Sequence, residues 1–337
     1  MCCRMRGKVV EPIMGNLPSA RLQPGFPFIR CGVDYAGPLH ILNRKGRGAK
    51  LEKCYLCIFV CFTTRAVHLE LVTSLSSESY ILALKRFILY LDQGRNFVGA
   101  ARELNTALVN NRRSIIDFTS DQQIEFKFSP PYAPHFGGLW EAGVKSCKHH
   151  INRVLGNCKL TFEEFSTVLA QIEAVLNSRP LYPMSTDPND LHPLTPAHFM
   201  IGRPLTALAE EELTAPQHTL SRYKHLECLR QQFWRRWSRE YITELQRRTK
   251  WQRDQASIQP GTLVIIKDDN LPPLKWQLGR ILSLFPGRDG VSRVANIRTA
   301  TGVTKRAFSK ICPLPVQSSY MDAVTRHDDD GAVAVHN

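Results

Sequence analysis

The feature that most constrains this fold is a pair of β-rich segments separated by only three residues. Residues 53–62 are almost continuously apolar, and residues 66–72 alternate between apolar and polar side chains. A short connection at residues 63–65 joins them, so the pattern predicts a β-hairpin. Within the second strand, alternation places two sets of side chains on opposite faces: Val67, Leu69 and Leu71 on one, His68 and Glu70 on the other.

Helical spacing predicts three helices after this hairpin. One begins near Ser76, and the others cover residues 139–154 and 161–177. The last of them stops at Asn177, because Pro180 cannot continue it. With a short strand before the hairpin, these elements predict an α/β or α+β layer fold.

A basic segment and a β-rich segment follow. Residues 219–253 contain ten Lys or Arg against three Glu, and their aromatic spacing predicts an amphipathic helix. Its apolar stripe consists of Trp234, Trp237, Tyr241 and Leu245. This helix either packs on a neighbour as a linker or contacts a DNA backbone. Residues 259–314 contain short β-rich runs broken by Pro, Gly and Asp, which predict a small antiparallel barrel.

The charge balance narrows the class of partner. Among 337 residues, 44 Lys and Arg against 30 Asp and Glu give a net charge of +14, which favours a polyanion. Charge alone does not separate nucleic acid from an acidic membrane surface. The longest apolar run, at residues 54–62, is too short to span a bilayer, so a transmembrane protein is not expected. DNA, and no membrane, is the expected partner. Without an apolar leader, the ten cysteines are expected to be reduced and intracellular.

A zinc site is not expected. Cys54 and Cys57 have the spacing of a zinc knuckle, but they lie in a predicted strand, where they would point to opposite faces. His149 and His150 form a pair without a matching second pair. These thiols are therefore interpreted as core side chains.

Three acidic residues stand out by their context. Asp34 ends an apolar strand beside a Gly-Pro turn, Asp92 follows a predicted helix, and Glu141 opens another. Carboxylates at such positions can converge on two Mg²⁺ ions for phosphoryl transfer. Each of them alone is more often structural, as a turn residue or a helix N-terminal acid.

At these residues the sequence resembles the integrase region of Pao/BEL-type LTR retrotransposon polyproteins, over roughly residues 1–315. The motifs that carry the resemblance are VDYAGP, DQGRNFVGAARELN, PPYAPHFGGLWEAGVK, LNSRPL and LTPAHFMIGRPL. The resemblance implies a ribonuclease-H-like mixed sheet with flanking helices. It also implies a catalytic and metal-binding triad of Asp34, Asp92 and Glu141 with two Mg²⁺ (or Mn²⁺) ions.

The helix that begins near Glu141 also predicts a DNA-binding face. Glu141, Lys145, Lys148 and Asn152 fall on one side of it. The two lysines are suited to DNA phosphates. The competing interpretation is a surface Glu–Lys pair. In the later basic helix, Arg235 and Arg236 are further candidates for DNA contact.

The resemblance also predicts a domain plan. Residues 1–30 are a lead-in segment left from a truncated zinc module, 31–205 the catalytic core, and 206–258 a basic helical linker. Residues 259–314 are the barrel, and 315–337 a disordered tail. The chain departs from the family just before Asp92, where residues 85–91 run into it with no Gly or Pro. Most of the strand that delivers the second aspartate is missing there, and misplacement by about 1 Å can cost a hundredfold in rate.

Two main functions therefore stay open. The first is a metal-dependent integrase that processes DNA 3′ ends and transfers strands, acting in the nucleus as a possible homo-oligomer on element-end and target DNA. The second is a catalytically decayed or domesticated fragment that only binds nucleic acid. A third interpretation makes the barrel a chromatin- or protein-binding module that uses Trp276 or Phe285.

Overall fold

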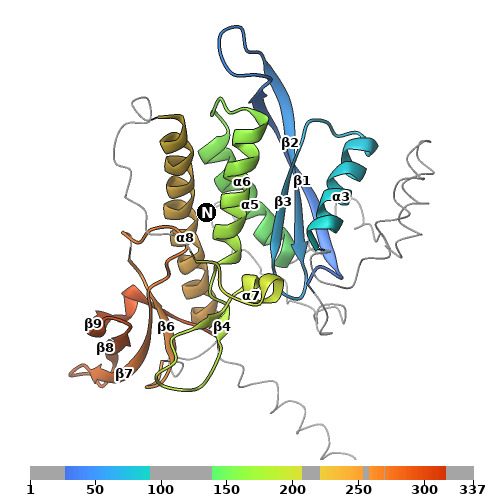
Figure 1. Ribbon diagram of the computed structural model, residues 1–337. Coiled ribbons are helices and arrows are strands. Elements are labelled where there is room, and N and C mark those ends of the chain that lie inside the picture. Colours follow the sequence, from blue (N-terminus) through green and yellow to red (C-terminus); the bar gives the residue numbers. More distant parts are fainter. Residues whose placement is uncertain (1–26, 92–138, 207–220, 253–257, 269, 316–337) are drawn as a thin grey trace, which may run out of the picture.

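The computed structural model describes residues 27–91, 139–206, 221–252, 258–268 and 270–315. These residues form an α+β fold, as the sequence predicts (Figure 1). The elements, in chain order, are β1 (Cys31–Leu42), β2 (Leu51–Cys61), β3 (Val67–Val72), α3 (Ser77–Leu91), α5 (Leu139–Leu155), α6 (Phe162–Asn177), β4 (Tyr182–Pro183), β5 (Pro193–Leu194), α7 (Pro196–Ile201), α8 (Arg222–Gln252), β6 (Leu263–Ile266), β7 (Leu278–Pro286), β8 (Ser292–Thr299), β9 (Gly302–Ala307), the 3₁₀ turn η4 (Phe308–Lys310) and β10 (Ile311–Pro313).

The predicted hairpin is confirmed as strands β2 and β3, which pair antiparallel. β1 pairs antiparallel with the other side of β2, giving the order β1-β2-β3. The turn closes where the Arg65 N–H donates to the Cys61 carbonyl at 3.1 Å, and Arg65 takes a positive φ of 58°. The mixed sheet that the family implies needs parallel strands as well, and residues 92–138 lie outside the described residues.

The side-chain alternation predicted for β3 is also confirmed. Its apolar set is buried in one core cluster, whereas His68 stacks on Phe87 on the opposite face. The same alternation separates the two cysteines of β2: Cys54 is buried with the first cluster and Cys57 with the second. These two thiols therefore cannot be neighbouring ligands of one ion.

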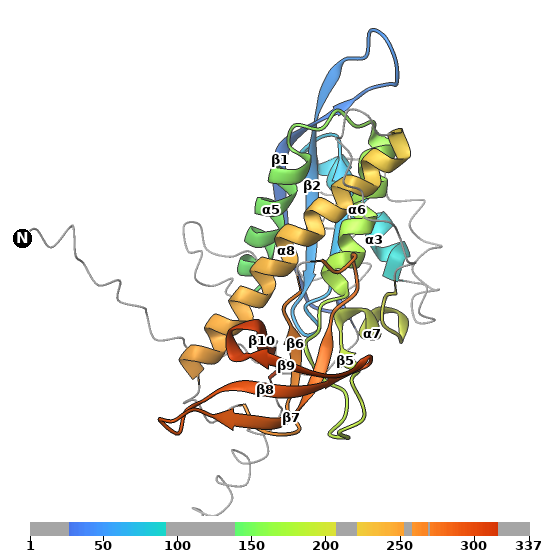
Figure 2. The same cartoon turned by 90° about the vertical axis from the view of Figure 1, so that its left-hand side faces the viewer.

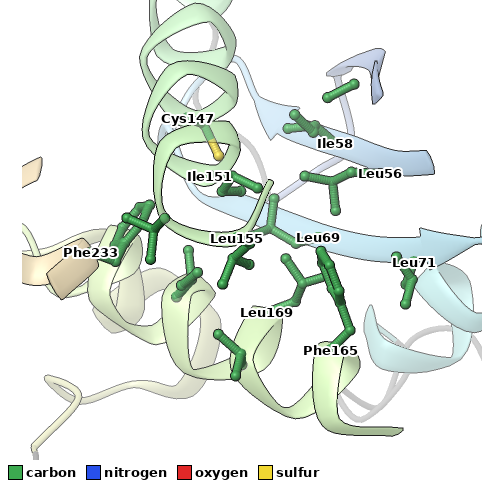
Figure 3. Close-up of a cluster of buried hydrophobic side chains, with 14 of the residues drawn as sticks. Leu56, Ile58, Leu69, Leu71, Cys147, Ile151, Leu155, Phe165, Leu169 and Phe233 are labelled. Atoms are coloured by element: carbon green, nitrogen blue, oxygen red, sulfur yellow. The ribbon is translucent and has the colours of Figure 1, made fainter. Parts of the chain in front are cut away.

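Helices cover both faces of the sheet. α5 and α6 lie on one face and α3 on the other (Figures 1 and 2). α8 lies outside α5 and α6 and crosses them both (Figure 2). Figure 3 shows side chains of the sheet meeting those of the three helices on that face: Leu56, Ile58, Leu69 and Leu71 from the strands, and Cys147, Ile151, Leu155, Phe165, Leu169 and Phe233 from the helices.

α8 lies in the segment that the sequence predicts to be a basic linker, and it packs by its aromatic stripe. Trp234 and Trp237 are buried, and Tyr241 packs against the same cluster. Phe233 and Leu229 of this helix are completely buried in the main core. The apolar side of α8 thus agrees with the first of the two interpretations, in which the helix packs on a neighbour.

Side chains of α6 form hydrogen bonds with backbone groups along the outer edge of β3. The Asn177 amide accepts the Val67 N–H at 2.9 Å and donates to the Val67 carbonyl at 2.7 Å. One turn earlier, Glu173 accepts the Leu69 N–H at 3.0 Å. Because residues four apart lie on one side of a helix, α6 replaces part of a neighbouring strand along this edge.

The C-terminal strands form a five-stranded antiparallel sheet in the order β10-β6-β7-β8-β9. Within the described residues no pairing joins β10 to β9, so closure of the predicted antiparallel barrel is not confirmed. A buried arginine fastens this sheet to the rest of the molecule. The Arg280 guanidinium donates to the carbonyls of Asp190, Ser185 and Gly261 at 2.7–2.8 Å.

Candidate active site

Asp34 lies near the start of β1, opposite Ile58 of β2. The sequence predicts that this strand ends beside the Gly-Pro turn. Instead, β1 continues to Leu42 through an irregularity between Ala36 and Leu39, where the Gly37-Pro38 peptide bond is cis. The side chain of Asp34 is 39% exposed, on the face of the sheet that α5 covers. One carboxylate oxygen, Oδ1, accepts the Tyr35 N–H at 2.7 Å. The other oxygen, Oδ2, is directed to a side chain of α5.

α5 is placed by its apolar stripe. Val144, Cys147 and Ile151 are buried against the sheet, at the spacing that the sequence predicts. The polar residues of the other side face solvent: Lys145 and Asn152 are exposed, and Lys148 is partly buried. The polar side of this helix therefore borders Asp34.

Lys148 and Asp34 form an ion pair across this border. The Lys148 Nζ lies 2.7 Å from the Asp34 Oδ2, and the two residues are 114 positions apart in the sequence. A pair exposed to this degree adds little stability. Its value is positional, because it brings one predicted catalytic residue and one predicted DNA-binding residue together.

The other two members of the predicted triad are not placed in this way. Glu141 lies in α5, two turns before Lys148, and helical spacing puts the two residues on the same side of the helix. The side chain of Glu141 lies outside the part of the chain that the structure describes. Asp92 lies outside the described residues. The convergence of the three carboxylates therefore stays a prediction.

The chemistry of Asp34 suits a hard divalent cation. Carboxylate oxygens are the ligands that Mg²⁺ prefers, and Oδ2 already accommodates a positive charge at 2.7 Å. In the part of the chain that the structure describes, no group of three His, Cys, Asp or Glu side chains lies close enough to hold a metal. A metal site here would thus need Asp92 and Glu141.

A contact that the sequence did not reveal ties α5 to α8. The two carboxylate oxygens of Glu240 accept from Ser146 at 2.9 Å and contact His150 Nε2 at 2.8 Å. Burial lowers the pKa of His150, although Glu240 opposes this effect. In the sequence, Ser146 and His150 are two polar residues one turn apart on the helix that packs on the sheet. Nothing in the sequence identifies Glu240 as their partner.

The predicted DNA contacts on α8 flank this junction. Arg236 is exposed and Arg235 partly buried. The charge of Arg236 is close enough to act on His150 and helps to lower its pKa. The cationic candidates of α5 and α8 thus lie on neighbouring helices, whereas contact with DNA stays a prediction.

The two aromatic residues considered for a binding cage are occupied within the chain. Trp276 donates through Nε1 to the Ser178 hydroxyl at 3.2 Å and packs edge-on against Trp234 at 4.7 Å. The ammonium of Lys305 lies 4.1 Å from the ring centroid of Phe285. Trp276 is thus packed against rings of its own chain, whereas Phe285 is 38% exposed and already pairs with a cation of its own chain.

Comparisons with known proteins add a partial family match. Residues 221–314, which contain α8 and the C-terminal sheet, match the model of a family of unknown function, DUF5641. No curated protein matches the chain. Among solved structures, the chain is similar to the cryoEM structure of the simian T-cell lymphotropic virus intasome in complex with PP2A regulatory subunit B56 gamma. The identity is 12% and the TM-score 0.31, over 88% of this chain and 84% of that one. A TM-score this low establishes no common fold.

A second polar cluster lies on the far side of the sheet from Asp34, beside a cavity of about 590 Å³ between β3, α6 and α7. His68 is 6% exposed there, with Nδ1 at 3.1 Å from Glu173 and Nε2 at 3.2 Å from Glu70. Glu70 also pairs with Arg86 of α3 at 2.7 Å. Burial alone would lower the pKa of His68, but the two carboxylates outweigh it and raise that pKa to about 9.

This cluster predicts a pH-dependent stability. The folded pKa of His68 lies above its ordinary value of 6.5, so its contribution is complete below pH 6.5 and is lost as the pH rises through about 9. We expect the wild type to exceed His68→Gln in unfolding free energy by up to about 3 kcal/mol at pH 6, and by much less at pH 9.5. Urea unfolding of both proteins at the two pH values measures this. An equal difference at both would contradict a charged His68.

Proposed function

We propose that this protein is an integrase of the Pao/BEL retrotransposon type, a metal-dependent polynucleotidyl transferase that binds DNA. The observation that carries the proposal is the 2.7 Å contact between Asp34 and Lys148. It joins the strand of the VDYAGP motif to the helix of the WEAGVK motif. In an enzyme of this class, the strand of the first motif and the helix of the second would meet at the reacting phosphate.

The proposed reaction has two steps on DNA. Water first attacks a phosphodiester near the element's 3′ end, and the 3′-hydroxyl that is released then attacks a phosphodiester of the target DNA. Asp34, Asp92 and Glu141 would hold Mg²⁺, which would activate the attacking oxygen and stabilise the leaving oxygen. Activity rests on the placement of Asp92, since most of the family's strand before it is missing from the sequence.

Lysines of α5 would position the DNA. An ammonium group has three donors, so Lys148 can keep one on Asp34 and offer the others to a phosphate oxygen. Lys145, one turn earlier and exposed, would add a second phosphate contact. Asn152, Arg235 and Arg236 would extend the DNA surface along α5 and α8.

The remaining expectations belong to this proposal. DNA is the partner, with element ends and target DNA as its two forms, and pairing of two ends would require an oligomer. None of the described helices is long and apolar enough to cross a bilayer. Action in the nucleus and the domain limits at residues 30, 205, 258 and 314 follow from the resemblance.

The test compares the wild type with Glu141→Gln on duplex oligonucleotides that carry the element's ends. Nicking and strand transfer with Mg²⁺ or Mn²⁺ that disappear in the variant would support the enzyme. DNA binding without turnover in either protein would support the alternative, a fragment that binds nucleic acid only. Absence of DNA binding would overturn both.

A further inference from the structure

The hairpin between β1 and β2 ends in a strongly basic tip. Residues 43–50, here named the basic arm, read NRKGRGAK and contain four cations and no acid. Every residue from 43 to 48, and Lys50, is exposed. In Figure 1 the tip extends from the top of the sheet, beyond the ends of α5 and α6.

Hydrogen bonds within the basic arm give it a defined shape. The Asn43 N–H donates to the Lys50 carbonyl, and the Lys50 N–H donates to the Asn43 side chain, both at 3.0 Å. The Arg44 guanidinium reaches the carbonyls of Arg47 and Gly48 at 3.5 Å. Gly46 and Gly48 provide the positive φ angles that reverse the chain.

The base of the arm is fixed to α6. The Leu42 N–H donates to the Leu160 carbonyl at 2.8 Å, just before α6 begins. Lys45 lies 3.4 Å from Glu164 in the first turn of α6, and Glu164 also binds Arg222 of α8. Hydrogen bonds from Arg222 lead the effects that lower the pKa of Glu164 to about 2, so its charge persists over the physiological range.

The other cations of the arm do not serve the fold. Among the described residues, the side chains of Arg47 and Lys50 make no hydrogen bond or ion pair. Their charges repel each other at the end of a protruding hairpin. Such an arrangement brings no benefit to stability and fits an anionic partner outside the chain.

We propose that the basic arm binds the phosphate backbone of duplex DNA whose reacting end lies at Asp34. This inference rests on the proposed function and extends it to a second contact. Asp34 and Leu42 belong to the same strand, eight residues apart, which spans about 26 Å at 3.3 Å per residue. The arm would therefore contact phosphates about eight base pairs from the reacting end, at 3.4 Å per pair.

The decisive variant is Arg47→Gln/Lys50→Gln, with Arg203→Gln/Lys85→Gln as the control. Both remove two charges and keep polar side chains, and Arg203 and Lys85 lie in the region of α7 and α3, away from the tip. We expect the arm variant to bind a 20-base-pair duplex about tenfold more weakly, with the slope of log K against log salt reduced by about 1.8. The control should bind like the wild type.

Hydroxyl-radical footprinting measures where along the DNA the basic arm makes contact. On element-end DNA the wild type should protect the backbone about eight base pairs from the end, and the arm variant should lose that protection alone. Equal affinity and an unchanged footprint would overturn the inference, even if the variant lost binding to vesicles with acidic lipids.

A third variant separates this inference from the proposed function. If Lys145→Gln/Lys148→Gln weakens DNA binding and the arm variant does not, the arm proposal fails and the integrase proposal survives. If neither pair weakens DNA binding, the arm proposal fails together with the DNA contacts assigned to Lys145 and Lys148, and the turnover assay with Glu141→Gln decides the integrase proposal. Unfolding midpoints equal to the wild type show that each variant is folded.

Discussion

Changing Asp34 to asparagine is expected to lower metal-dependent nicking and strand transfer by about a thousandfold or more while DNA stays bound. The amide keeps the size of the side chain and removes its negative charge. A metal would lose a ligand, and the Lys148 ammonium would lose the partner that it contacts at 2.7 Å. Because that ammonium becomes available to phosphates, DNA affinity should stay equal or rise. Single-turnover cleavage and fluorescence anisotropy measure the two effects.

The matched control is Asp289→Asn. Asp289 is also an exposed aspartate paired with a cation, with Arg293 at 2.6 Å in the connection between β7 and β8. This change should leave turnover unchanged. If the Asp34 variant remained as active as the control, Asp34 would not be part of the catalytic site. Fold damage is excluded if both variants unfold at the same urea concentration as the wild type.

Changing Phe233 to alanine is expected to cost about 3–5 kcal/mol of unfolding free energy. The ring is completely buried in the main core, where α8 packs on α5 and α6. Its loss leaves a cavity in the main core although it lies on the predicted linker helix. Equilibrium urea unfolding followed by tryptophan fluorescence measures the change, since Trp234 and Trp237 adjoin the site.

Tyr223→Ala on the same helix is the control, because Tyr223 is 70% exposed. It should change stability by less than about 0.5 kcal/mol. If Phe233→Ala had an equally small effect, α8 would be an independent linker in solution and not part of the core. Two separate unfolding transitions in the wild type would point the same way.

The parts of the fold that follow local periodicity were predictable. The two-residue period of β3 placed Leu69 and His68 on opposite faces, and the helical period placed Cys147 and Ile151 on one stripe. A period gives the buried side of an element and does not name its partner. The stripe of α8 was therefore read correctly, while its position across α5 and α6 required the structure.

Long-range polar contacts were not predictable. Arg280 is one of many arginines in a basic chain, and only the structure shows that it binds three carbonyls. Nothing in the sequence singles out Glu240, yet it joins α8 to Ser146 and His150. The five antiparallel strands of the C-terminal segment followed from its short β-rich runs, but whether they close into a barrel depends on strand length and tilt, which the sequence does not give.

For the candidate site, the sequence supplied the residues and the structure supplied one contact between them. Asp34 and Lys148 were assigned separate roles from their motifs, and spacing along the chain gave no reason to join them. The basic arm was missed for another reason. Its cations lie in a turn-rich stretch without periodicity, and only the long register of β1 and β2 shows that it projects from the sheet.

The way α6 completes the edge of β3 bears on how the chain is made. Val67 bonds to Asn177, 110 residues later, so a ribosome adding about 5–20 residues per second leaves that edge open for roughly 5–20 s. During this interval the exposed N–H and C=O groups are a template for strands of other nascent chains. We expect a product that ends before residue 170 to aggregate more strongly than one that ends at residue 180. Chaperone demand during synthesis should be concentrated in that window.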